Sequence, residues 1–421
     1  MGISFERVKK NMARKRVRQL LRWAPIYTLG RLMVQKGLIK FPYRSTAMTV
    51  DYALEQFRKT YSHRYPSVWT SAFYPMELLH ALDIPIFSPE VASAVIAGMG
   101  FQREFLQEGE SKWWGRDNCA FHRCAMGGIQ LDYFPRPLAY CASSHLCDGG
   151  HLLFANLARK EKLPYLLMDV PRQNDEKALK YVVSQLQLML GSLQDISGRK
   201  LDPDRLEEAV HNAERARQAM SKVNLLRLDL ASPLRSAEAF GFLFLYFTGL
   251  GSREMPEIYE TLAGELEENI GNVTAPEKPP RYRLLWLHLK PFYRNDLLNY
   301  LEEKGARIIF EEFNHVYWGA MDKNKPLESI AERMLSHFIY GDITHRLQVI
   351  RELAEKYEVD GVIHFSHWGC HQNSGSLRIM RDFLRKEGLP FLSLDGDCID
   401  DRNYAAGQLQ TRLDGFLEML S

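Results

Sequence analysis

The sequence predicts an α/β protein that has two Rossmann-like parallel-sheet domains, a helical segment between them and an N-terminal helical extension. Helical stretches alternate with short apolar runs over residues 46–174 and again over residues 279–421, as in βα units of a parallel sheet. Over residues 175–278 the pattern is almost wholly helical. The chain has 421 residues, of which 46% are hydrophobic and 25% charged, so it can bury more than one core.

The N-terminal extension, residues 1–45, is strongly basic. Residues 7–44 contain twelve Lys or Arg and no Asp or Glu, and because the net charge is +2, the rest of the chain carries about −10. Such a segment suits docking on an acidic partner or an anionic membrane surface, but a solvated helical extension explains it as well. We do not expect nucleic-acid binding, because the body of the chain is acidic and contains no recognisable binding module.

The location of the protein is predicted from its apolar stretches and its cysteines. The basic start leads into an apolar stretch that charged residues interrupt, so no export signal is visible. The most apolar uncharged run, residues 239–252, is too short to span a bilayer and predicts a buried helix. We therefore expect a cytoplasmic protein without a transmembrane segment, whose six cysteines are reduced.

Each predicted domain contains specific elements. In the first, helices over residues 76–82 and 151–160 lead into strands over residues 84–87 and 165–170. In the helical segment, Asp202 is a plausible helix start, and the apolar residues that follow it have helical spacing. The second domain repeats the strand–helix rhythm, with strands predicted over residues 282–289, 307–310, 361–365 and 390–394 and helices over 295–304, 347–357 and 376–387.

Three of the cysteines stand where a metal site could form. Cys147 immediately precedes a helical stretch and Cys370 follows a predicted buried strand, so both belong to the carboxyl ends of parallel strands, where ligands collect. Cys119 follows a Trp-rich loop. Their spacing matches no standard zinc or ferredoxin pattern, and buried cysteines are often small hydrophobes. Zinc bound by these three cysteines and one of His145, His367 or His371 is the competing metal site.

The motifs around these cysteines resemble those of the 2-hydroxyacyl-CoA dehydratase and benzoyl-CoA reductase family. The resemblance extends from about residue 66 to residue 421. Its first motif combines Cys119, Arg123 and Gly127, its second is the pair Cys147 and Asp148, and its third is Cys370 after Asp360-Gly361-Val362. Residues 75–81 and 397–402 are supporting stretches, and the order of the motifs is more specific than any one of them.

This resemblance implies a [4Fe-4S] cluster on Cys119, Cys147 and Cys370, with one iron open. The chain would be the iron-sulfur subunit of a radical, anaerobic 2-hydroxyacyl-CoA dehydratase, a lyase that reduces an acyl-CoA thioester by one electron to a ketyl radical, which then expels hydroxide. The implied partners are a homologous subunit, in a heterodimer or homodimer, and an ATP-dependent iron-sulfur activator. The alternatives are an aromatic acyl-CoA reductase subunit of the benzoyl-CoA type, and a non-catalytic cluster-bearing structural or electron-relay subunit.

Other side chains are candidates for roles near the cluster. Ser71 and Glu77 would hydrogen-bond the substrate, although a helix cap and a surface carboxylate are the simpler interpretations. His367, expected in the loop beyond its strand, would donate to the cluster or act as an acid, unless it is a satisfied core histidine. Asp148 is expected to cap the helix after Cys147.

Two further expectations concern the remaining cysteines and the nucleotide cofactors. We expect Cys124, Cys141 and Cys398 to be structural thiols. No phosphate-binding loop or dinucleotide fingerprint is present, so we do not expect this chain to bind ATP or NAD.

Overall fold

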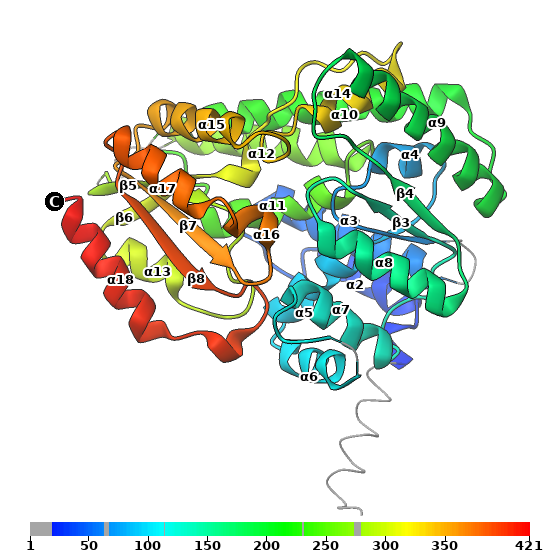
Figure 1. The fold of residues 1–421 in the computed structure, drawn as a ribbon, viewed down its shortest axis with the longest axis horizontal. Coiled ribbons are helices and arrows are strands. Elements are labelled where there is room, and N and C mark those ends of the chain that lie inside the picture. Colours follow the sequence, from blue (N-terminus) through cyan, green and yellow to red (C-terminus); the bar gives the residue numbers. More distant parts are fainter. Residues whose placement is uncertain (1–18, 63–66, 113, 230, 273–278) are drawn as a thin grey trace, which may run out of the picture.

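Two parallel sheets of four strands each lie side by side in the computed structural model (Figure 1). The structure describes residues 19–62, 67–112, 114–229, 231–272 and 279–421. The strand orders are β2-β1-β3-β4 in the first sheet and β6-β5-β7-β8 in the second. Every strand pair is parallel, so each strand must return through a helical crossover. The predicted α/β class with two parallel sheets is confirmed.

The first sheet is built from very short strands. Its elements are β1 (Val68–Thr70), α4 (Met76–Ala81), β2 (Ile86–Phe87), α5 (Pro89–Gly98), α6 (Gln102–Lys112), α7 (Ala120–Gln130), β3 (Tyr140–Ser143), α8 (Asp148–Glu161) and β4 (Tyr165–Met168). The sequence analysis gave no residue bounds for β1 and β3, which pair with each other at the centre of the sheet. Both strands are buried along their whole length, so they show no alternation of polar and apolar residues.

Four helices form the predicted helical segment, and a helix of the second half joins them. They are α9 (Glu176–Ser197), α10 (Pro203–Leu226), α11 (Ser236–Thr248) and α12 (Glu254–Asn272). As predicted, α10 starts after Asp202, whose side chain accepts a hydrogen bond from the backbone N–H of Asp204. Helix α14 (Pro326–Leu335) packs against α9, and its Arg333 forms a buried ion pair with Glu77 of α4 at 2.8 Å. One continuous core therefore connects the first sheet, the helical segment and part of the second half.

The second sheet follows the prediction closely. Its strands are β5 (Tyr282–Leu287), β6 (Ala306–Glu311), β7 (Gly361–His367) and β8 (Phe391–Gly396). The helices of this half are α13 (Leu297–Glu303), α14 (Pro326–Leu335), α15 (Ile343–Lys356), α16 (His371–Ser374), α17 (Leu377–Lys386) and α18 (Ala406–Met419), with short 3₁₀ turns at Glu312–Asn314 and Asp401–Asn403. His367 is the last residue of β7 rather than part of the loop beyond it, which corrects the sequence prediction.

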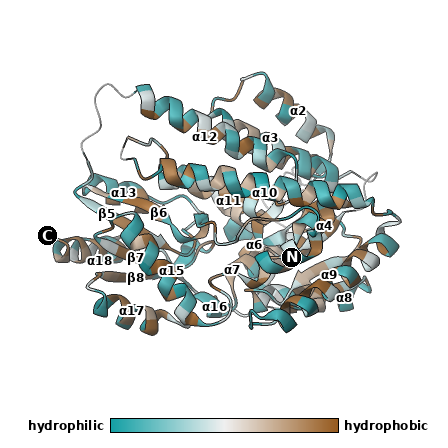
Figure 2. Ribbon diagram, turned by 90° about the horizontal axis from the view of Figure 1, so that it is seen from above, coloured by the Kyte–Doolittle hydropathy of each residue, from teal (hydrophilic) through white to brown (hydrophobic). Residues whose placement is uncertain are grey.

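The N-terminal extension contains a helix in the part that the structure describes. Helix α2 (Pro25–Gln35) packs on α3 (Arg44–Thr60), and Figure 2 shows both helices with α12 on one side of the molecule. Arg31 of α2 pairs with Asp51 of α3 at 3.0 Å, so part of the basic charge is neutralised within the chain. The basic residues before residue 19 lie outside the described residues. Among the helices that the structure describes, none combines the length and the hydrophobicity needed to cross a membrane.

Candidate functional site

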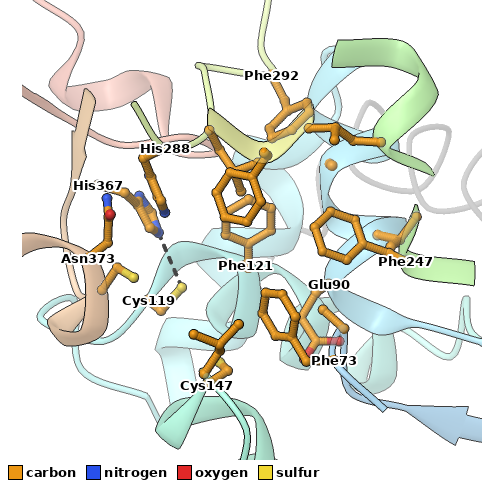
Figure 3. Close-up of a pocket in the computed structure, with 18 of the residues that line it drawn as sticks. Phe73, Glu90, Cys119, Phe121, Cys147, Phe247, His288, Phe292, His367 and Asn373 are labelled. Atoms are coloured by element: carbon orange, nitrogen blue, oxygen red, sulfur yellow. Dashed lines mark hydrogen bonds between the residues drawn. The ribbon is translucent and has the colours of Figure 1, made fainter. Parts of the chain in front are cut away.

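A cavity of about 350 Å³ lies between the two sheets, at the carboxyl ends of their strands. Its walls come from the segments that follow β1, β2, β3, β5, β6 and β7, from the start of α7, from the segment after α14 and from one face of α11. Cys119, Cys147 and Cys370 all line it, and Figure 3 labels Cys119 and Cys147. Three thiols that are 28 and 223 residues apart in the sequence therefore meet at one space, as the positions after the strands predicted.

Each of the three cysteines is the residue that immediately precedes a helix. Cys119 precedes α7, Cys147 precedes α8 and Cys370 precedes α16. The backbone N–H groups and the partial positive charge of a helix N-terminus favour a thiolate. The Sγ of Cys147 accepts a hydrogen bond from the N–H of Gly150 at 3.3 Å, so this thiol itself caps α8. The prediction that Asp148 caps the helix is therefore wrong, because Asp148 is the first residue of α8.

Two glycines let the cysteine loops touch each other. Gly369 has a φ of +76°, and a Cβ at this position would lie 2.6 Å from the backbone nitrogen of Cys119. A Cβ on Gly149 would lie 2.6 Å from the ring of His122, on the helix that Cys119 begins. The Cys370 loop and the Cys147 loop thus both rest on the start of α7. This packing fixes the three thiols relative to one another.

His367 donates a hydrogen bond to Cys119. Its Nδ1 accepts the backbone N–H of Cys398 at 3.1 Å, so the neutral ring must carry its hydrogen on Nε2. That nitrogen lies 3.2 Å from the Sγ of Cys119 (Figure 3). Burial, with nearby His122 and Arg123, lowers the pKa of His367 to about 3, so the ring is neutral. The neutral ring of His367 is therefore better suited to donate a hydrogen bond to sulfur than to act as a general acid.

Arg123 holds the backbone that leads into Cys119. Its side chain is 2% exposed, and its Nε donates to the carbonyl oxygen of Asn118 at 2.9 Å. Its two terminal nitrogens donate to Asp397 and Asp400, each at 3.3 Å. Arg123 therefore ties the Cys119 turn to the segment after β8, from the opposite half of the chain. Arg123, the basic residue of the first motif, therefore has a structural role in positioning Cys119.

His122 and Glu90 lie beside Cys147. The Nε2 of His122 lies 3.9 Å from the Sγ of Cys147 and 3.7 Å from the Oε1 of Glu90. Burial opposes the charged form of His122, but Cys147 and Glu90 outweigh it and raise the pKa to about 10. The Oε1 of Glu90 is buried, has no hydrogen-bond partner and belongs to the cavity wall. Sequence reasoning missed Glu90, because a glutamate in the first turn of a helix is usually a solvated residue.

The donor set fits an iron–sulfur cluster better than a single ion. Burial raises the pKa of Cys370 to about 11, and Cys147 contributes to this rise, so thiolates here need a compensating positive charge. Among the described residues, no group of three or more His, Cys, Asp or Glu is placed to hold one metal ion. One zinc ion needs every ligand sulfur at about 2.3 Å. A cubane instead binds each thiolate at a different iron, which suits three thiols around a shared space.

Two of the predicted catalytic residues do not line the cavity. The Oγ of Ser71 accepts the backbone N–H of Ser143 at 3.1 Å and thereby joins β1 to β3. It is not the cap of α4, which begins at Met76. Glu77 is fully buried and binds Arg333 through both carboxylate oxygens at 2.9 Å, so it is not a surface carboxylate. These contacts make both residues part of the framework of the first sheet.

The three remaining cysteines are fully buried and do not line the cavity: Cys124, Cys141 and Cys398.

Two unusual backbone positions line the cavity. Leu146 has a φ of +63° and His288 a φ of +70°, and neither is glycine. Such conformations cost free energy and tend to occur at functional sites. The Nδ2 of Asn373 is also buried there without a partner, while its Oδ1 accepts from Arg346 at 2.7 Å.

The fold and the site together define a protein that presents three thiols from two parallel sheets to one enclosed space. The chain belongs to the family described as "2-hydroxyglutaryl-CoA dehydratase, D-component", whose profile matches residues 71–420. This family includes benzoyl-CoA reductase subunits, so the chain is a subunit of a dehydratase or of a benzoyl-CoA reductase. The resemblance stated from the motifs is therefore confirmed.

Individual relatives are distant in sequence but match most of the chain. It is 22% identical to the (R)-2-hydroxyisocaproyl-CoA dehydratase alpha subunit of Clostridioides difficile, over 88% of this chain and 94% of that protein. It is 27% identical to the (R)-2-hydroxyglutaryl-CoA dehydratase alpha subunit of Acidaminococcus fermentans, over 75% and 65%. It is 25% identical to a benzoyl-CoA reductase subunit of Thauera aromatica, over 82% and 86%.

Proposed function

We propose that this chain is the iron–sulfur subunit of a 2-hydroxyacyl-CoA dehydratase and holds a [4Fe-4S] cluster on Cys119, Cys147 and Cys370. The observation that carries the proposal is the meeting of these three thiols, from three separate helix starts, at one cavity. When bound, the cluster would supply a low-potential electron and, at an iron without a protein ligand, a Lewis acid.

The residues of the chain supply position and proton chemistry. His367 donates its Nε2–H to Cys119 and so orients this ligand. The Oε1 of Glu90 and the Nδ2 of Asn373, which have no hydrogen-bond partner among the described residues, offer one acceptor and one donor to a bound thioester. Glu90 is therefore the residue that we assign to accept a hydrogen bond, or a proton, from the 2-hydroxyacyl group. The apolar remainder of the wall excludes water from the reacting atoms.

An aromatic acyl-CoA reductase is the second candidate. Phenylalanines dominate the cavity wall, and a benzoyl-CoA reductase subunit is among the relatives. Such an enzyme would use the same cluster but would add electrons and protons to the ring without losing water. The names of the three relatives cover aliphatic, dicarboxylic and aromatic acyl groups at 22%, 27% and 25% identity, so similarity alone does not choose between them.

We further propose that the chain works with a homologous subunit and an ATP-dependent iron–sulfur activator. The relatives that match it include proteins named as alpha subunits and one named as a beta subunit, which supports a heteromeric enzyme. The described part of the chain contains no element that we assign to ATP.

The test is an anaerobic assay of the chain with its homologous subunit and activator, supplied with a panel of 2-hydroxyacyl-CoA and aryl-CoA thioesters. Mass spectrometry of the products separates the functions, because a dehydratase product lacks one water and a reductase product gains two hydrogens. The Cys370→Ser variant is the control and should abolish conversion. If the cluster-loaded wild-type enzyme converts no thioester, the catalytic proposal fails and a structural or electron-relay subunit remains.

A further inference from the structure

We propose that the cavity beside the three thiols binds an uncharged acyl group that ends in an aromatic ring. This inference rests on the proposed function, because it names the class of acyl group that the same site accepts. Dicarboxylic acyl groups, whose far end carries a carboxylate, are therefore not among the preferred substrates. Three features of the cavity support it: the composition of the wall, the position of its charges and the geometry of its rings.

The wall of the cavity is aromatic to an unusual degree. Six of its seven phenylalanines keep part of their side-chain surface exposed, and only Phe240 is buried. Large aromatic side chains normally bury themselves, so their shared exposure here marks a space that a ligand fills. The seven are Phe73, Phe121, Phe240, Phe244, Phe247, Phe292 and Phe313.

Helix α11 contributes the largest apolar part of this wall. Phe240, Leu243, Phe244 and Phe247 recur at helical spacing, so they share one face of α11, and all four line the cavity. Phe73 and Phe121 come from the first half of the chain, and Figure 3 shows their rings close to that of Phe247. Figure 3 shows His288, His367 and Asn373 across the space, on the side of Cys119, while Glu90 lies beside Phe73. A bound acyl group would therefore keep its thioester end near the thiols and its far end among the rings.

No cation is available at the aromatic end. None of the residues that line the cavity is Arg or Lys. His122 already faces Glu90 at 3.7 Å and Cys147 at 3.9 Å. Behind the wall, Arg346 is paired with Glu312 at 2.6 Å.

Lys290 lies 5.9 Å from the ring of Phe240 and 5.8 Å from that of Phe292, and it is not part of the lining. Burial lowers the pKa of Lys290. A carboxylate at the far end of the acyl group would therefore be buried without a partner, and this is strongly unfavourable.

The rings are arranged to accept another ring. Phe73 and Phe247 meet at 5.6 Å with an interplanar angle of 85°, and Phe121 and Phe292 meet at 6.0 Å with an angle of 77°. These edge-to-face pairs leave ring faces and edges toward the space they surround, which is the geometry that a further aromatic ring extends. The volume of about 350 Å³ must hold the cluster as well as the acyl group, so the remaining space suits a compact acyl group rather than a long chain or the whole coenzyme.

The inference is tested by binding, with thioesters that lack the 2-hydroxyl group and do not react. Anaerobic titration calorimetry on the cluster-loaded enzyme compares 3-phenylpropanoyl-CoA, 4-methylpentanoyl-CoA and glutaryl-CoA. We expect the phenyl thioester to bind most tightly, and glutaryl-CoA at least about 100-fold more weakly. Glutaryl-CoA binding within tenfold of the phenyl thioester would overturn the inference, and tighter binding of 4-methylpentanoyl-CoA would overturn its aromatic part.

A pair of variants adds a test of the charge argument. Phe247→Arg places a cation at the aromatic end and should strengthen glutaryl-CoA binding at least tenfold while weakening the phenyl thioester. Phe247→Leu keeps the site apolar and should preserve the wild-type order. Binding of the three thioesters to the wild-type enzyme decides the inference even if the Phe247→Arg variant does not fold.

The failure of this inference and the failure of the proposed function give different results. An enzyme that binds 3-phenylpropanoyl-CoA tightly but converts no thioester contradicts the function and supports the aromatic site. An active dehydratase that prefers 2-hydroxyglutaryl-CoA supports the function and contradicts the aromatic site.

Discussion

Replacing Gly369 by alanine tests whether contact between two loops holds the thiols together. A Cβ at this position would lie 2.6 Å from the backbone nitrogen of Cys119 and 2.8 Å from its Cα. Ordinary van der Waals contact begins at 3.4 Å, so the loops must separate by about 0.8 Å. Backbone atoms cannot rotate away, and a functional site tolerates displacements of only about 0.5 Å. The Gly369→Ala variant should therefore lose most of its iron.

The matched control is Gly388→Ala. Gly388 has a φ of +73°, close to the +76° of Gly369, but a Cβ there would meet nothing within 4 Å. Both variants should lose about 1–2 kcal/mol of unfolding free energy, because both place an alanine in the left-handed region. Only Gly369→Ala adds the clash with Cys119.

The assay is iron and sulfide analysis after anaerobic reconstitution, with urea unfolding of both variants alongside. We expect near-normal iron in Gly388→Ala and a loss of more than half in Gly369→Ala. Equal iron in the two variants would refute the reasoning, because it would show that the distance between the loops does not control assembly of the cluster.

Three further predictions follow from other contacts. Glu77→Ala leaves Arg333 buried and unpaired, so urea unfolding should show a loss of about 3–5 kcal/mol. The control Glu260→Ala breaks an exposed ion pair and should cost under about 1 kcal/mol of unfolding free energy. Similar losses in Glu77→Ala and Glu260→Ala would contradict the claim that burial makes the Glu77 pair important. Glu90→Gln should lower turnover about 100-fold or more at unchanged iron content, and normal turnover would remove Glu90 from the chemistry. His367→Phe removes a hydrogen bond to a ligand sulfur, so redox titration should show a more negative cluster potential, and an unchanged potential would contradict donation to Cys119.

The second half of the fold could be predicted well because its strands are long and apolar. Strand β7 and its neighbours have six or seven residues, which is enough for an apolar run to stand out between helices. In the first half, β1 and β3 have three and four residues and are buried throughout. Runs this short carry too little pattern to distinguish them from turns. The first sheet was therefore predicted only in part, because its strands are short.

Sheet topology accounts for two of the three thiols, because the ends of parallel strands lie together, whereas Cys119 joined the set only through the family resemblance. The positions of Cys147 and Cys370 after such strands were enough to place them near each other. The partner of Glu77, by contrast, is Arg333, and these two residues are 256 positions apart in the sequence. Nothing near Glu77 distinguishes a buried carboxylate from a solvated one. The same is true of Glu90, whose place in the cavity depends on how α5 packs.

The most direct test of the account is metal analysis of the anaerobically purified wild type and its single-cysteine variants. We predict about four iron and four sulfide per chain in the wild type. Serine at Cys119, Cys147 or Cys370 should abolish most of this content, while serine at the buried Cys141 should retain it. A colourless wild-type protein with one zinc, or full iron content in the three serine variants, would contradict the account.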